Sequence, residues 1–303
     1  MSQRTHPTNS QHVASLRLPE SGVVRILSDL HLGHPGTLFS SISEVLPLLE
    51  GADLVIFNGD VTEDCSKDLE PKSTAMWNEL LEELDARNIR WHRLRGNHDP
   101  LTDLPGAFTL DGEKLLITHG DACFEYGSPW SRWLPEIKHR LDAIREDFIR
   151  DGLNPLNDRL ALAEAWASCF HPPTRHNQSK RRGIFAYIWQ AFWPPSVAWR
   201  LITHRLRTLP KTSEFLETYA PNTRLLIYGH MHRAGVWKRN GRVLINTGAF
   251  QSFAGQLVCE LDHTGITVRK VRRKDGRFDF GRKKCHFSWS SLGVDPYADQ
   301  SEQ

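Results

Sequence analysis

Oxygen and nitrogen donors that bind divalent metals recur in five short clusters along this chain of 303 residues. The clusters are Asp29-Leu30-His31, Gly59-Asp60, Gly96-Asn97-His98-Asp99, His119-Gly120-Asp121 and Gly229-His230-Met231-His232. Carboxylates, an amide and imidazoles are ligands that borderline divalent metals prefer, and the clusters contain no cysteine. This composition predicts a two-metal hydrolytic centre.

Each cluster follows a strand-like apolar run. The runs are Val23–Ser28, Leu54–Asn58, Ile89–Leu94, Leu115–Thr118 and Leu225–Tyr228. A single D-x-H or H-x-H is weak evidence, because a histidine near a strand end is more often a surface or hydrogen-bonded residue than a ligand. In open sheets with α/β connections, ligands gather beyond the carboxyl ends of the strands. The recurrence therefore predicts that the five clusters converge on one site.

The order of the elements indicates an α/β pattern that becomes β-rich. Thr37–Glu50 and Ser73–Asn88 have helical spacing and lie between the first three strands. Later, Asp111-Gly112 and Asn240-Gly241 separate strand-like runs and predict hairpins. Periodicity alone supports only an α/β or α+β fold.

The five clusters resemble the signature of the calcineurin-like metallophosphoesterase superfamily, which runs D-x-H, G-D, G-N-H-D, H and G-H-x-H. All five blocks are present, in order and without substitution. The resemblance covers residues 23–121 and 222–250. It implies an αββα sandwich, in which two mixed β-sheets are flanked by helices.

The resemblance also implies a set of metal ligands. One metal would be held by Asp29, His31 and His232, the other by Asn97, His119 and His230, and Asp60 would bridge the two. At a separation of about 3.5–4 Å, one hydroxide can bridge both metals and act as the nucleophile at neutral pH. We expect manganese first, with iron or zinc as alternatives, because the same ligands bind all three.

Cleavage of a phosphoester also requires a group that protonates or shields the leaving oxygen. The family pattern places His98 outside the metal ligands for this role, and the pKa of histidine suits it. An acidic residue three positions after the bridging aspartate orients this histidine in the family, so Glu63 is the candidate here. Asp64 is the alternative.

Other polar residues in and beside the motifs are not among the implied metal ligands. We expect Asp99 and Asp121 to brace their loops by hydrogen bonds rather than to bind metal. His34, Arg95 and Arg233 are candidates for substrate binding, and arginine can hold phosphate oxygens in a bidentate manner. For His34 the alternative is a solvated loop histidine.

Length and composition fit a globular enzyme with one large domain. The chain has 39% hydrophobic residues and a net charge of +2. Its five cysteines include no C-x-x-C pair, which argues against a disulfide framework or a zinc knuckle and favours a reducing compartment. Residues 1–20 lack a secretory signal, and their composition predicts a disordered tail. We expect residues 21–290 to form the enzyme domain and residues 291–303 to form a C-terminal tail.

Residues 124–221 form an insertion that predicts a helical cap over the site. Arg132–Arg150 and Asn157–Phe170 both have helical spacing. From Phe170 to Lys211 there are eight Lys or Arg and no Asp or Glu, with aromatic residues interleaved. This composition predicts binding of an amphiphilic phosphate, or peripheral contact with the inner face of a membrane by a cytoplasmic protein. The alternative is that the aromatic residues only pack the cap onto the core.

A second basic run, Arg269–Lys284, predicts a solvated edge strand protected from aggregation by its charge. No feature of the sequence indicates an oligomeric state.

Three classes of function compete. The leading class is a metal-dependent phosphoesterase or pyrophosphohydrolase. The alternatives are a nuclease of the same superfamily, which we expect less, and a non-catalytic scaffold with the same fold. The layout of the insertion resembles that of the UDP-diacylglucosamine pyrophosphohydrolases, but those enzymes commonly carry arginine at the position of His98, which leaves the substrate open.

Overall fold

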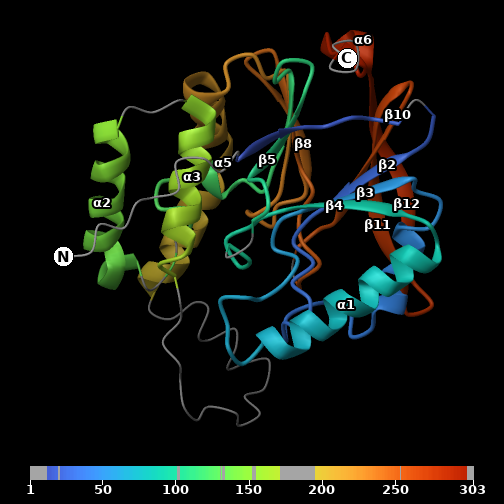
Figure 1. The fold of residues 1–303 in the computed structure, drawn as a ribbon, viewed down its shortest axis with the longest axis horizontal. Helices are drawn as coiled ribbons and strands as arrows, with labels where there is room; N and C mark the ends of the chain where they lie inside the picture. The colour runs from blue at the N-terminus through green and yellow to red at the C-terminus, as the bar shows by residue number, and fades with distance from the viewer. Residues whose placement is uncertain are drawn as a thin grey trace.

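Two six-stranded β-sheets face each other, and helices lie outside both of them (Figure 1). The computed structural model describes residues 12–19, 21–100, 103–129, 131, 134–151, 155–170, 195–252 and 254–298. The arrangement is the αββα sandwich of mixed sheets that the sequence motifs imply.

Sheet A has the strand order β1-β5-β6-β7-β9-β8. Its strands are β1 (Val13–Ser15), β5 (Ala107–Leu110), β6 (Leu115–Thr118), β7 (Leu225–Tyr228), β9 (Arg242–Asn246) and β8 (Gly235–Arg239). The strands β6, β7 and β9 run parallel, whereas β5–β6 and β8–β9 are antiparallel hairpins. Both hairpins turn at the predicted dipeptides, Asp111-Gly112 and Asn240-Gly241, which have positive φ angles.

Sheet B has the strand order β12-β11-β10-β2-β3-β4. Its strands are β12 (Arg277–Ser288), β11 (Gly265–Lys274), β10 (Leu257–Asp262), β2 (Val24–Leu27), β3 (Leu54–Asn58) and β4 (Arg90–Leu94). The strands β2, β3 and β4 are parallel, and β10 joins β2 antiparallel. This mixture of parallel and antiparallel strands confirms the predicted change from an α/β to a β-rich pattern.

Side chains of the central strands alternate between two cores. In β3, Leu54 and Ile56 are buried between the sheets, whereas Val55 and Phe57 are buried on the outer face of sheet B. Strand β7 alternates in the same way between the inner core and the outer face of sheet A. Since successive residues of a strand point to opposite faces, a strand covered on both sides must be apolar throughout.

Helices cover the outer face of each sheet (Figure 1). Helix α1 (Glu70–Ala86) packs on sheet B, and helices α3 (Pro155–Ala167) and α5 (Pro195–Tyr219) pack on sheet A. Helix α2 (Leu134–Asp151) packs against α3 on the side away from the sheet. Among the helices of the described ranges, none combines the length and the apolar character needed to cross a membrane.

These helices confirm the predictions for residues 73–88, 132–150 and 157–170. Most of the basic and aromatic segment, residues 171–194, lies outside the described residues. The cap over the site therefore stays a prediction.

The prediction of a helix over residues 37–50 is wrong. Two short 3-10 turns occupy this segment instead, Ile42–Glu44 (η1) and Leu46–Leu48 (η2). Ser41 and Glu44 form a capping box that starts the first turn. Pro47 lacks the N–H that a continuous α-helix would need at that point, so the chain forms two turns in succession.

The ends of the domain extend further than predicted. Residues Val13–Ser15, expected in a disordered tail, form β1 and pair in parallel with β5. Leu16 is buried, and its N–H donates to the Thr109 carbonyl oxygen at 2.7 Å. At the other end, Leu292 and Val294 are buried in the core between the sheets. Both predictions failed because a few apolar residues near a terminus give no periodic signal.

The long β11–β12 hairpin carries the second basic run. β12 is the edge strand of sheet B, and much of the hairpin is exposed. Arg269 pairs with Glu260, and Arg272 pairs with Asp279. The prediction of a solvated, charged edge is confirmed.

We predict that Leu16→Ala lowers the free energy of unfolding by about 2–5 kcal/mol, because it leaves a cavity in the core between the sheets. Urea denaturation followed by circular dichroism measures the change. Arg17→Ala is the matched control, since Arg17 is exposed and should change stability by less than about 0.5 kcal/mol. Equal stabilities for Leu16→Ala and the wild type would contradict the place of β1 in the domain.

Candidate metal centre

The five predicted clusters follow the carboxyl ends of β2, β3, β4, β6 and β7. Backbone hydrogen bonds join neighbouring loops, from Asp29 N–H to the Gly59 carbonyl oxygen (3.0 Å) and from Gly229 N–H to the His119 carbonyl oxygen (2.8 Å). The His230 N–H donates to both carboxylate oxygens of Asp29, at 3.1 and 3.2 Å, which joins a loop of sheet A to a loop of sheet B. The clusters therefore converge on one site, as predicted.

One group of donors consists of Asp29, His31, Asp60 and His232, which each place a ligand atom within 4.8 Å of the others. His232 Nε2 lies 3.2 Å from Asp29 Oδ1 and 3.2 Å from His31 Nε2. His31 Nε2 lies 3.8 Å from Asp60 Oδ2. Asp29, His31 and Asp60 are buried, whereas His232 is 31% exposed. The exposed edge of this group is therefore at His232.

The second group consists of Asp60, His119 and His230. His119 Nε2 lies 3.4 Å from Asp60 Oδ2 and 3.2 Å from His230 Nδ1. Asn97 Oδ1 joins this group at 3.2 Å from His119 Nε2. Asp60 belongs to both groups, which is the position that the motif pattern implies for a bridging carboxylate.

Three of the histidines are oriented by acceptors on their far side. The contacts are His31 Nδ1 with Glu63 Oε1 (2.8 Å), His119 Nδ1 with the Asn58 carbonyl oxygen (3.3 Å), and His230 Nε2 with the Gly127 carbonyl oxygen (3.0 Å). When each of these nitrogens donates, the other nitrogen of the ring is left to bind a metal. The roles of Asn58 and Gly127 were missed, because a backbone carbonyl carries no residue-type signal in a sequence.

The electrostatics of the site favour positive charge. Asp29 and Asp60 are 0% and 1% exposed, and within the described part of the chain their ion-pair partners are histidines. Burial would lower the pKa of His119, but the carboxylates of Asp60, Asp29 and Asp121 together outweigh burial and raise that pKa to about 10. Buried carboxylates need such cationic partners, because desolvation of an unpaired charge is costly. The nitrogen and oxygen donors therefore fit divalent cations of the manganese, iron or zinc type.

The backbone at the site is strained. Five of the seven predicted ligands are non-glycine residues with positive φ: Asp29 (55°), His31 (48°), Asp60 (51°), His230 (65°) and His232 (48°). This left-handed region is unfavourable for residues with a side chain and is populated mainly where the surrounding structure enforces it. The turns at the strand ends thus direct side chains into the site at a conformational cost.

The glycines before two of the ligands leave room for the carboxylates. A Cβ on Gly96 would lie 2.2 Å from Asp60 Oδ1, and a Cβ on Gly229 would lie 2.1 Å from Asp29 Oδ2. These distances are far below van der Waals contact. The G-N-H-D and G-H-x-H motifs need glycine at these two positions because a side chain would displace the carboxylates.

Glu63 connects the metal ligands to His98. Its Oε1 accepts from His31 Nδ1 at 2.8 Å, and its Oε2 accepts from His98 Nδ1 at 2.9 Å. The prediction that Glu63 orients His98 agrees with this contact, while its contact with His31 was missed. Asp64, the alternative, lies 4.0 Å from Arg93 instead.

Asp99 holds the second and third loops together, as expected. Its carboxylate accepts from the N–H groups of Val61 (2.8 Å) and Gly96 (2.6 Å), and from Arg93 Nη2 (2.7 Å). Asp60 N–H adds a contact of 3.2 Å. Asp99 therefore acts on the site by fixing the backbone of Asp60.

The three candidates for substrate binding differ in burial and in the groups that they contact. Arg95 is 1% exposed and pairs with Asp121 (3.4 Å) and Glu164 (3.2 Å), so it ties its loop to α3, and these contacts contradict a role in substrate binding. His34 Nδ1 accepts from Gly36 N–H at 2.9 Å, and burial lowers its pKa to about 4, which makes the ring neutral. Arg233 lies over the ring of Trp237. For His34 and Arg233 substrate contact stays a prediction.

The fold and the donor set define a class of metal-dependent hydrolases. The sequence model of the Calcineurin-like phosphoesterase family matches residues 23–234, which is more than half of the chain. The chain belongs to this family and is a hydrolase that acts on phosphoester bonds. The resemblance to UDP-diacylglucosamine pyrophosphohydrolases stays a prediction.

Several solved structures are similar to this one at low sequence identity. Vacuolar protein sorting 29 from Cryptosporidium parvum has a TM-score of 0.41 and 14% identity, and the match covers 89% of this chain and 100% of that chain. YfcE, a phosphoesterase from E. coli, has a TM-score of 0.39 and 16% identity, with coverage of 88% and 98%. Vps29 from Entamoeba histolytica in complex with zinc has a TM-score of 0.39 and 13% identity, with coverage of 88% and 99%. No curated protein sequence matches.

We predict that Asp60→Asn loses metal, because the neutral amide no longer offsets the charge of two neighbouring cations. Elemental analysis of the protein after reconstitution with manganese, followed by desalting, measures the metal content. Asp85→Asn, on the exposed face of α1, is the matched control and should retain the wild-type content. A wild-type metal content in a folded Asp60→Asn protein would contradict the bridging role.

Proposed function

We propose that this phosphoesterase uses two divalent metal ions, with Asp60 between them and His98 as the general acid. The observation that carries the proposal is that two groups of metal donors share the Asp60 carboxylate. Asp29, His31 and His232 would hold one ion, and Asn97, His119 and His230 the other. We propose manganese, with iron and zinc as alternatives, because nitrogen and oxygen donors of this kind bind all three metals.

When bound, the metal ions supply Lewis acidity that polarises the phosphoryl group and lowers the pKa of water. The protein itself fixes the donors before substrate arrives. Asp99 fixes the backbone of Asp60, and the acceptors behind His31, His119 and His230 fix the rings. Such preorganisation avoids rearrangement during the reaction.

The surroundings of His98 support a role in protonating the leaving oxygen. Its ring is 41% exposed, so a substrate can reach it. Burial lowers the pKa of His98, but the carboxylates of Glu63 and Asp60 outweigh burial and raise it to about 10. With Nδ1 donating to Glu63, Nε2 is left to donate to the leaving oxygen of the substrate.

For the substrate we propose an amphiphilic or lipid-linked phosphate, presented at a membrane surface that residues 170–211 contact. The support is the composition of that segment, which combines eight cations with aromatic residues and no acid. Basic residues near an anionic surface contribute about 1 kcal/mol each, and aromatic residues bury at the interface. A nuclease activity remains the alternative.

We predict that manganese-reconstituted protein hydrolyses phosphoesters and that Asp60→Asn does not. The assay uses p-nitrophenyl phosphate and bis-p-nitrophenyl phosphate, which share a leaving group, followed by a lipid-linked pyrophosphate and single-stranded DNA. Preference for the lipid-linked substrate supports the proposed substrate class, whereas preference for DNA favours the nuclease. Equal rates for the wild type and Asp60→Asn would refute the proposed centre.

We predict that His98→Ala keeps both metals but turns over about 10²–10⁴-fold more slowly, which is the contribution of a positioned general acid. The defect should be smallest for p-nitrophenolate, which leaves without protonation, and largest for alkoxide leaving groups. His92→Ala on the exposed part of β4 is the matched control. An equal defect for all leaving groups, or a protein without metal, would rule out this role.

A further inference from the structure

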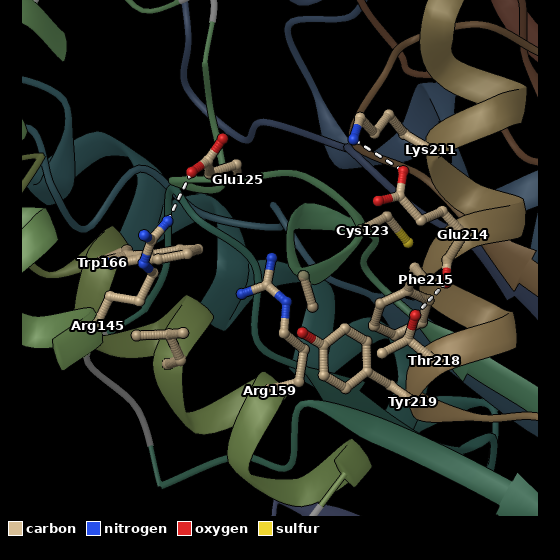
Figure 2. Close-up of a pocket in the computed structure, with 12 residues that line it drawn as sticks. Cys123, Glu125, Arg145, Arg159, Trp166, Lys211, Glu214, Phe215, Thr218 and Tyr219 are labelled. Carbon is tan, nitrogen blue, oxygen red and sulfur yellow. Dashed lines mark hydrogen bonds and ion pairs between the residues drawn. The ribbon is translucent and has the colours of Figure 1, made fainter. Parts of the chain in front are cut away.

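A cavity of about 340 Å³ lies between η3 (Asp121–Cys123) and helices α2, α3 and α5 (Figure 2). Small-molecule sites in proteins have volumes of about 300–1,000 Å³, so the cavity is large enough for a small ligand. None of its 12 lining residues is a predicted metal ligand. The cavity is thus separate from the centre described above.

Arg159 of α3 is the principal polar group of the cavity. Arg159 is only 6% exposed. Figure 2 shows its guanidinium directed into the cavity between the aromatic rings. Nη2 donates to the Phe124 carbonyl oxygen at 2.7 Å. Nη1 is buried and has no hydrogen-bond partner among the described residues. A buried charge is costly when no opposite charge lies beside it, so the guanidinium makes the cavity suited to an anion.

The other charges of the cavity neutralise each other. Arg145 pairs with Glu125 at 2.8 Å, and Lys211 pairs with Glu214 at 2.8 Å, and all four side chains are largely exposed. One positive charge therefore remains, on Arg159. A single negative charge balances it, whereas a phosphate dianion would leave an excess.

The rest of the wall is apolar and aromatic. Leu162, Phe215 and Tyr219 line the cavity together with Trp166. The Arg159 guanidinium carbon lies 4.8 Å from the centre of the Trp166 ring and 5.8 Å from that of Tyr219, so the two rings hold the guanidinium in place. A ligand that fits this wall must carry an apolar body beside its charged group.

We propose that this cavity binds an organic monoanion, in which a carboxylate pairs with the Arg159 guanidinium and an alkyl or aryl body packs on the aromatic wall. The ligand would lie against the segment 123–127. Phe124 of this segment accepts from Arg159, and the Gly127 carbonyl oxygen orients His230. The site and the metal centre therefore share one loop.

Isothermal titration calorimetry of the metal-loaded full chain with octanoate tests the proposal. We expect one octanoate per chain, and binding at least about tenfold weaker for octan-1-ol and octylammonium, which lack the negative charge. Saturating inorganic phosphate, a competitor for the metal centre, should leave octanoate binding unchanged. Absence of binding at millimolar octanoate, equal binding of octan-1-ol, or displacement by phosphate would overturn the proposal.

Substitutions place the ligand at Arg159. Arg159→Gln should weaken octanoate binding about tenfold or more, because a charged hydrogen-bond donor is lost. Arg140→Gln, an exposed position on α2 outside the cavity, is the matched control and should bind as the wild type. Lys211→Glu makes the lining negative at an exposed position and should weaken binding about threefold or more. This variant decides the question if Arg159→Gln does not fold, and unchanged binding in the folded variants would refute the site.

Discussion

The burial of the Asp60 carboxylate is the constraint on which the rest of the centre depends. It is 1% exposed and lies where loops from both sheets meet. A carboxylate in such a place must be surrounded by cations and donors, and histidines from both sheets lie around it. The same requirement makes this site suited to a metal cation, because carboxylate oxygens and imidazole nitrogens lie close together around Asp60.

The rigid sandwich holds these charged side chains close together. Strands covered by apolar side chains on both faces hold the five loops at fixed positions, and the loops carry the strained φ angles of the ligands. Asp99 adds hydrogen bonds that join two loops, and Arg95 anchors its loop to α3. Strain persists at functional sites where the surrounding structure over-determines the backbone. The rigid core therefore maintains the geometry of the site.

The sequence predicted the elements whose signals are local and repeated. Apolar runs such as Leu54–Asn58 marked strands, and motif residues such as Asp29 and His119 marked the site, because ligands follow strand ends. Features that depend on contacts distant in sequence were missed. Arg95 resembles a phosphate-binding residue until Asp121 and Glu164 are seen beside it. Leu16 becomes a core residue only because β1 pairs with β5.

Glu63 links two histidines of the site through one carboxylate. One carboxylate accepts from His31, a predicted metal ligand, and from His98, the proposed acid. Any change in the charge of one ring alters the field at the other through this shared acceptor. Groups connected in this way have coupled titrations and non-additive responses to substitution. The orientation of a predicted metal ligand and that of the proposed acid are therefore set by one side chain.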